Sequence, residues 1–152
     1  MYNIFTFLQE MKDPIVFSAL KTHGTYYSGS YLTSYSKFLT NYGDGFNLQT
    51  GVFKAPRSGV YKFSASTYFG TNDDQDTHEI SVEKNNRKEM EFQSWIAHTN
   101  KWSIENDQDT LTFDFILVLQ KSDTVRLRVN DGKFQCSDWY ACIFSGHFVR
   151  EI

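Results

Sequence analysis

Apolar side chains recur at every second position over many short stretches of this chain, and this spacing constrains the fold more than any other feature. The clearest stretch runs from Gly59 to Phe69, where inward and outward positions alternate strictly. A period of two residues is typical of a β-strand that buries one face. The stretch therefore predicts a strand whose inward side chains are Tyr61, Phe63, Ala65, Thr67 and Phe69, with Lys62, Ser64 and Ser66 outward.

The same alternation appears at residues 80–92, 125–129 and 144–148. Polar residues 84–88 separate two alternating runs, and Asn130-Asp131-Gly132 supplies turn chemistry after a third. Many short strands with regularly spaced turns predict an all-β fold, a jelly-roll β-sandwich of about ten antiparallel strands. Residues 6–12 carry a weak helical signal of one or two turns that stops before Pro14.

Residues 111–119 depart from this pattern, because the second half of the stretch is apolar on both faces. Leu111, Phe113, Phe115, Leu117 and Leu119 share one face, whereas Ile116 and Val118 lie on the other. A strand of an ordinary sandwich has one face in water. The pattern therefore predicts cover from another subunit, and the alternative is cover by a loop or by the N-terminal arm.

Charge and hydropathy exclude two classes of partner. The formal net charge is only −3, whereas a protein that binds the phosphate backbone needs a clustered basic face, so we expect no nucleic-acid partner. No apolar run approaches the roughly 20 residues that span a bilayer, so we expect no membrane insertion. Residues 1–8 are apolar but lack a basic start and a small-residue cleavage site. If the protein is secreted, its signal peptide is absent from this sequence.

Motifs of the common enzyme classes are absent, so we predict no catalytic residues and no required cofactor. The four histidines show no metal-ligand spacing. Cys136 and Cys142 lie six positions apart and are either a local disulfide or two small buried side chains.

Three longer motifs carry a family resemblance. They are Tyr35-Ser36-Lys37-Phe38-Leu39-Thr40-Asn41, the run from Thr50 to Ser64, and the ending from Ile143 to Val149. In order and spacing they resemble the globular-head domain of the complement C1q family, whose fold is similar to that of the tumour necrosis factor ligands. The resemblance covers roughly residues 15–152, so we expect an N-terminal arm at residues 1–13 and one C1q-like globular domain at residues 14–152.

The resemblance implies a secreted, extracellular homotrimer assembled around a threefold axis. It implies that a set of six mostly aromatic and apolar side chains builds the core or the trimer interface: Tyr61, Phe63, Phe115, Ile116, Val118 and Phe148. One departure concerns a turn. The family usually has Gly-Asp before the penultimate strand, whereas this chain has Ser122-Asp123, which implies a modestly different turn.

An acidic segment raises the question of calcium. Asp73, Asp74 and Asp76 follow a predicted strand and offer oxygen ligands to a hard cation. Some members of the family bind calcium near the threefold axis, but the nearest matching positions here are Thr77 and Asn86. The alternative is a solvated acidic loop.

Two predicted loops carry aromatic and polar residues suited to ligand binding. Trp95 and Trp102 lie in residues 93–109, and a second set, Lys133, Asp138, Trp139 and Tyr140, lies in residues 133–142. The alternative is that the tryptophans plug the ends of the sandwich. The leading hypothesis is lectin-like pattern recognition in innate immunity, with binding of carbohydrate or microbial surfaces. The alternatives are a cytokine-like ligand for a protein receptor and an extracellular-matrix component.

Overall fold

The computed structural model describes residues 3–5, 13–70, 77–95 and 108–152. Within these residues the chain forms twelve strands. In chain order they are β1 (Val16–Lys21), β2 (Gly24–Tyr27), β3 (Lys37–Tyr42), β4 (Phe46–Asn47), β5 (Val52–Lys54), β6 (Gly59–Gly70), β7 (Thr77–Lys84), β8 (Arg87–Trp95), β9 (Gln108–Leu119), β10 (Thr124–Asp131), β11 (Lys133–Cys136) and β12 (Cys142–Arg150). The helical turns expected at residues 6–12 lie outside the described residues.

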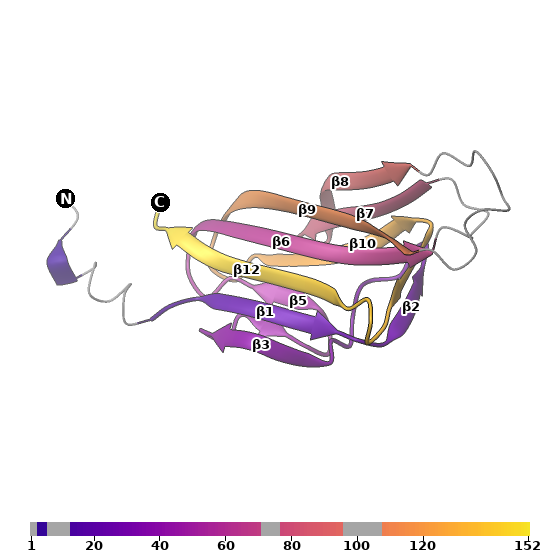
Figure 1. Ribbon diagram of the computed structural model, residues 1–152. Helices are drawn as coiled ribbons and strands as arrows, with labels where there is room; N and C mark the ends of the chain where they lie inside the picture. Colours follow the sequence, from indigo (N-terminus) through magenta and orange to yellow (C-terminus); the bar gives the residue numbers. More distant parts are fainter. Residues whose placement is uncertain (1–2, 6–12, 71–76, 96–107) are drawn as a thin grey trace, which may run out of the picture.

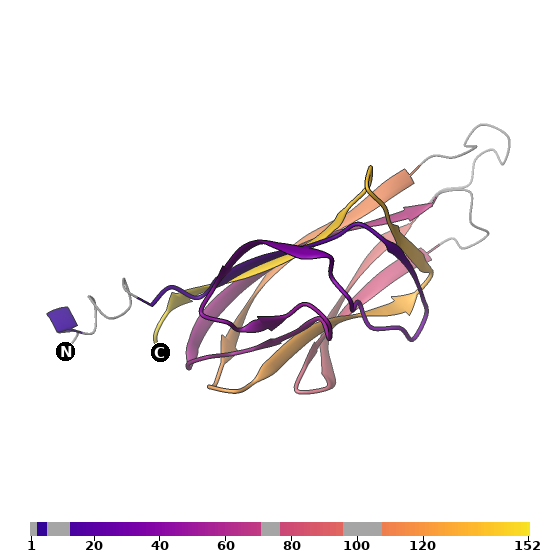
Figure 2. The ribbon, with the colours of Figure 1, turned by 90° about the horizontal axis from the view of Figure 1, so that it is seen from below.

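Ten of these strands form a two-layer sandwich (Figures 1 and 2). Sheet 1 has the order β3-β1-β12-β6-β9, and sheet 2 has the order β4-β5-β10-β7-β8. Strands β2 and β11 form a separate two-stranded ribbon. All pairings are antiparallel, so the all-β sandwich expected from the sequence is confirmed.

Strands β6 and β9 bury one set of alternate side chains in the core and place the other set on the outward face of sheet 1. They pair along their whole length, with Phe63 opposite Phe115 and Lys62 opposite Ile116. Phe63 and Phe115 face the core, and Phe63 is completely buried. Lys62 and Ile116 lie on the outward face of sheet 1 and are exposed.

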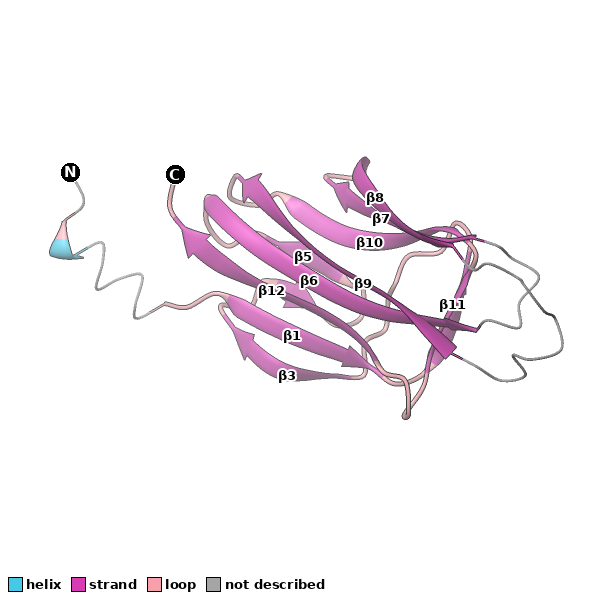
Figure 3. Cartoon of the chain, turned by 45° about the horizontal axis from the view of Figure 1, so that its top comes forward, coloured by secondary structure: helices cyan, strands magenta, loops and turns pink. Residues whose placement is uncertain are grey.

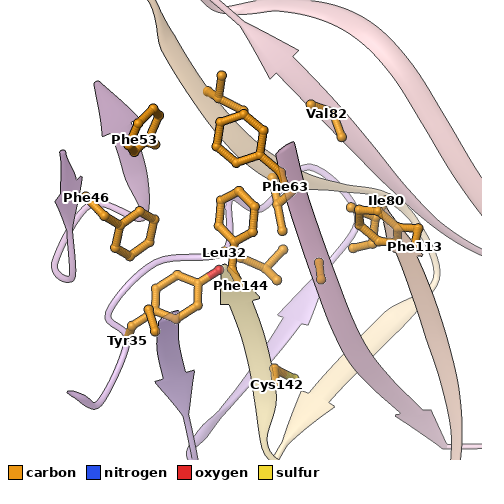
Figure 4. Packing of buried hydrophobic residues seen from close by; sticks show 14 of the residues in the cluster. Leu32, Tyr35, Phe46, Phe53, Phe63, Ile80, Val82, Phe113, Cys142 and Phe144 are labelled. Atoms are coloured by element: carbon orange, nitrogen blue, oxygen red, sulfur yellow. The ribbon is translucent and has the colours of Figure 1, made fainter. Parts of the chain in front are cut away.

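Aromatic rings fill the space between the sheets (Figure 4). Phe17 stacks on Phe46 with 4.4 Å between the ring centroids, and its edge meets Phe144 at 5.3 Å. Tyr61 is also completely buried, and its hydroxyl donates a hydrogen bond to the carbonyl oxygen of Arg57. Phe148 is half-buried and packs its edge against Tyr61. Such aromatic pairs add to the gain from burial alone.

Two turns use left-handed backbone. Asn85 and Asn86 connect β7 to β8 with φ values of 50° and 65°, a conformation that asparagine tolerates. Ser122 precedes β10 with φ of 75°, at the position where the C1q family usually has glycine. The backbone therefore takes a conformation that favours glycine even though this chain has serine there. Among the described residues, no helix is long and apolar enough to cross a membrane.

Candidate functional site

The loop between β11 and β12, residues 137–141, projects from the end of the sandwich opposite to the C-terminus and the start of β1 (Figure 3). A disulfide between Cys136 and Cys142 closes its base, with 5.4 Å between the two Cα atoms. Both cysteines are buried. Of the two readings that the spacing left open, the structure has the disulfide.

Hydrogen bonds inside the loop fix its shape. The backbone N–H of Ser137 donates to the carbonyl oxygen of Tyr140 at 3.0 Å, and the N–H of Tyr140 donates to Oγ of Ser137 at 3.1 Å. Between them Trp139 is 91% exposed. An indole so exposed does not fill the end of the sandwich, so the alternative that Trp139 is a plug is wrong.

Polar and aromatic groups lie beside Trp139 in the sequence of the loop and on strand β11, which leads into it. Tyr140 is 42% exposed and its ring lies 5.4 Å from that of Tyr68 at the end of β6. Asp138 is exposed, and its Oδ2 lies 3.9 Å from Nε2 of His23. Lys133 places its Nζ 5.9 Å from the ring centroid of Tyr27 on the neighbouring strand β2. We call Lys133, Asp138, Trp139 and Tyr140 the distal site.

The second predicted loop does not join this site among the described residues. The backbone of Trp95 ends β8, where it pairs with Thr77 of β7. Trp102 lies outside the described residues.

The three aspartates predicted for calcium, Asp73, Asp74 and Asp76, also lie outside the described residues. The two nearest matching positions do not suit a cation. Thr77 donates its hydroxyl to Asp131 at 2.6 Å, and Asn86 Oδ1 accepts a hydrogen bond from the guanidinium of Arg126 at 2.9 Å. Across the described ranges, no group of three or more His, Cys, Asp or Glu side chains is arranged to hold a metal ion.

The outward face of sheet 1 keeps apolar side chains in solvent. Ile116 is 62% exposed, Val118 is 51% exposed, and Val149 near the end of β12 is 49% exposed. No described loop or arm residue covers Ile116 or Val118. Tyr61 and Phe63 belong to the core, as does Phe115 of β9, whereas Ile116 and Val118 are surface residues.

The outward face of sheet 2 carries a buried polar ladder that the sequence reading missed. Glu79 and Glu83 of β7 are 8% and 6% exposed although they point away from the core. Glu83 accepts a hydrogen bond from the Tyr31 hydroxyl at 3.1 Å, and the guanidinium of Arg126 lies 3.5 Å from the Tyr31 ring centroid. The available signal was the charge at alternate positions, with Glu79 and Glu83 on β7 and Arg126 and Arg128 on β10; the register places Glu83 opposite Arg126.

Burial raises the pKa of Glu79, and a hydrogen bond to Glu91 on β8 raises it further. Asn130 opposes this shift because its side-chain amide donates to the Glu79 carboxylate. Lys88 holds the pKa of Glu91 below its ordinary value through a hydrogen bond of 2.7 Å. The carboxyl group of Glu91 therefore ionises more readily than that of Glu79.

Solved structures with the same arrangement of sheets come from two groups. The globular domain of zebrafish complement 1qA protein aligns with a TM-score of 0.67 at 16% sequence identity, covering 91% of this chain and 99% of that one. The Eiger TNF of S. frugiperda aligns with a TM-score of 0.70 at 10% identity, covering 92% and 95%. Murine APRIL aligns with a TM-score of 0.68 at 9% identity, covering 90% and 99%. No curated protein sequence matches the chain.

These similarities define the class as the C1q/TNF-like β-sandwich. Within that class, the sequence profile of the C1q domain matches residues 16–149. The chain belongs to the C1q domain family. The family is non-enzymatic.

Proposed function

We propose that this domain is a secreted, homotrimeric recognition module that binds carbohydrate on microbial or other surfaces through its distal site. The observation that carries the proposal is Trp139, which is 91% exposed on a loop closed by the Cys136–Cys142 disulfide. An exposed indole on a fixed loop offers contact area at a small cost in conformational entropy. The planar ring suits stacking on the apolar face of a sugar.

The neighbours of Trp139 supply the polar part of such a site. Lys133 at the start of β11 and Asp138 in the loop carry opposite charges, so they are able to orient hydroxyl or carboxylate groups of a ligand. Tyr140 widens the aromatic surface toward Tyr68. Loops on a rigid sandwich commonly carry function.

Trimer formation is supported by the outward face of sheet 1. Ile116 and Val118 are exposed at positions where a solvated strand carries polar side chains. Domains of the C1q/TNF-like fold typically assemble as trimers, and a cover for this face from a second copy of the chain removes both side chains from water. Three distal sites on one trimer raise the avidity for a repetitive surface without any new contact.

Secretion is supported by the disulfide. Disulfides persist in oxidising, extracellular compartments and are rare in the cytosol. Members of the C1q family are typically secreted.

Binding to a glycan array and to whole bacteria, with and without calcium, tests the proposal. The variant is Trp139→Ala, and the control is Ile152→Ala, which removes an exposed apolar side chain outside the distal site. We expect Trp139→Ala to abolish binding and Ile152→Ala to preserve most of it. Unchanged binding by Trp139→Ala would exclude the distal site. A loss of binding that occurs only when calcium is removed would favour a calcium-dependent site at residues 71–76.

A second candidate function has its own supporting observation. The indole of Trp139 is exposed to solvent, whereas small-molecule sites are usually concave and bury most of the ligand. A projecting tryptophan is also typical of energetic hot spots between proteins, where the partner supplies the pocket. An absence of glycan binding, together with saturable binding to cell-surface protein that Trp139→Ala abolishes, would favour a receptor ligand.

A further inference from the structure

A histidine lies directly opposite a lysine on the outward face of sheet 1. The register places His147 of β12 between Val16 of β1 and Lys62 of β6, and it places Lys62 opposite Ile116 of β9. Directly opposed residues of antiparallel strands have Cβ atoms about 4.5–5.5 Å apart. His147 and Lys62 are both exposed, so their side chains share one solvent-facing row.

The charges around His147 are unbalanced. From β6 it faces Lys62, whose Nζ lies 3.8 Å from Oδ2 of Asp114 on β9. From β1 it faces uncharged side chains, and β3 adds the phenol of Tyr42 beyond Val16. On its own strand, Arg150 follows the bulge that ends β12 and pairs with Val60.

Among the described residues, Asp114 of β9 is a carboxylate paired with Lys62, and it lies in the neighbouring outward row, opposite Ser64. A proton on His147 adds a second positive charge directly beside Lys62. Like charges in directly opposed cross-strand positions are destabilising.

Apolar side chains flank this charged group. Ile116 ends the row on one side, and Val118 opposite Val60 occupies the next outward row. A second copy of the chain that covers Ile116 and Val118 therefore also removes water from Lys62 and His147. Water and salt screen a like-charge pair on an exposed face, whereas the same pair in a covered interface is screened much less.

We propose that His147, placed directly opposite Lys62, makes the trimer sensitive to acid: the assembly holds at pH 7.5 and weakens at pH 5.5. Imidazole is the side chain that ordinarily changes charge between pH 8 and 5. The inference rests on the trimer proposed above and deepens it, because it assigns a regulatory residue to the same face. When the trimer dissociates in an acidified compartment, the avidity is lost and a multivalent ligand is released.

Sedimentation velocity of the whole chain over a concentration series at pH 7.5 and pH 5.5 tests the inference. In wild-type protein we expect the subunit concentration at half-dissociation to rise at least about tenfold at pH 5.5. The dissociation constant of a trimer scales with the square of that concentration, so this rise corresponds to about 2.7 kcal/mol per trimer. In His147→Gln this rise should vanish, because glutamine stays neutral. The matched control is His23→Gln, which removes an exposed histidine of the distal end and should dissociate like wild type.

A second variant tests the partner charge. Lys62→Gln removes the opposing cation and leaves Asp114 as the charged neighbour of the row. Acid should then no longer weaken the trimer, because a protonated His147 no longer lies opposite an ammonium group. Circular dichroism at both pH values checks that each variant remains folded.

The possible failures are distinguishable. A monomer mass for wild type at pH 7.5 would overturn the trimer and this inference with it. A trimer that is equally stable at both pH values, or an acid effect that persists in His147→Gln, would overturn the histidine switch alone.

Discussion

The rings of Phe92 and Phe113 stack with 4.3 Å between their centroids and 10° between their planes, although β8 and β9 belong to different sheets. This contact joins the two edge strands along one open side of the sandwich. Phe113 points inward from β9, so the positions of opposite parity, Ile116 and Val118, point outward. Strand β9 therefore holds the sandwich together with one face and presents an apolar surface with the other.

The outward face of β9 gives the first prediction. Ile116→Glu should convert the proposed trimer to a monomer at micromolar concentration, because an unpaired charge in an apolar interface is costly. The free energy of unfolding of the subunit should change by no more than about 0.5 kcal/mol, as is usual for an exposed position. Light scattering measures the mass, and Trp139→Ala is the control that should remain trimeric. A trimer mass for Ile116→Glu would place the interface elsewhere.

Glu79 gives a prediction about pH. Its pKa in the folded chain is raised above the ordinary value of 4.5 by burial and by Glu91, so its charged form destabilises the native state. This destabilisation is absent at pH values below the ordinary pKa, where Glu79 is protonated in both the folded and the unfolded chain. It is fully present once the pH exceeds the raised pKa of the folded chain. Glu79→Gln should therefore stabilise the domain at pH 7.5 by roughly 0.5–1 kcal/mol and have no effect at pH 4.

Urea unfolding at the two pH values measures this difference. Glutamine keeps an acceptor for Asn130 and offers an amide to Glu91, so no polar neighbour is abandoned. Glu89→Gln on the exposed part of β8 is the control and should be neutral at both pH values. A loss of stability in Glu79→Gln at pH 7.5 would contradict the charge assignment.

The turn before β10 gives a third prediction. Ser122 has φ of 75°, and its backbone N–H donates to the carbonyl oxygen of Ala55 at 2.8 Å. Glycine takes this conformation without the Cβ strain that serine pays, so Ser122→Gly should stabilise the domain by about 0.5–1 kcal/mol. Ser28→Gly, at an exposed serine without a left-handed backbone, should give no gain. Thermal unfolding measures both, and equal shifts in the two variants would contradict the strain argument.

The disulfide gives a fourth prediction. Replacement of Cys136 and Cys142 by alanine together should lower the free energy of unfolding by about 2–3 kcal/mol in the chain-entropy model for so short a loop. Ligand binding should weaken further, since Trp139 then loses its fixed position. Reductant should reproduce both effects in wild-type protein and leave the double variant unchanged. Two free thiols in mass spectra of non-reduced native protein would contradict the bond.

Much of the fold was predictable because the alternating pattern is local. Tyr61 and Phe63 on β6 indicate a buried face within a few residues, and the paired asparagines after β7 indicate a hairpin. The outward apolar pair Ile116 and Val118 was also visible, because it breaks the alternation of its own strand.

The exposure of Trp139 was not predictable from its neighbours. Ser-Asp-Trp-Tyr has no period, and an indole in such a loop fills a cavity or projects according to contacts made with distant strands. The burial of Glu83 was not predictable for the same reason, because Tyr31 and Arg126 contact it from segments about 50 and 40 residues away in the sequence. The opposition of His147 and Lys62 likewise depends on strand register rather than on any local motif.

Strand β12 is the last strand of the chain, yet it lies at the centre of sheet 1, between β1 and β6. While a ribosome is still making the chain, β1 and β6 therefore have no common neighbour, and their unpaired edges face the cellular environment. Such long-range pairings close slowly, and the exposed edges of the nascent chain are prone to aggregation. A premature stop codon before residue 142 should consequently yield an insoluble product for quality control rather than a shortened but working domain.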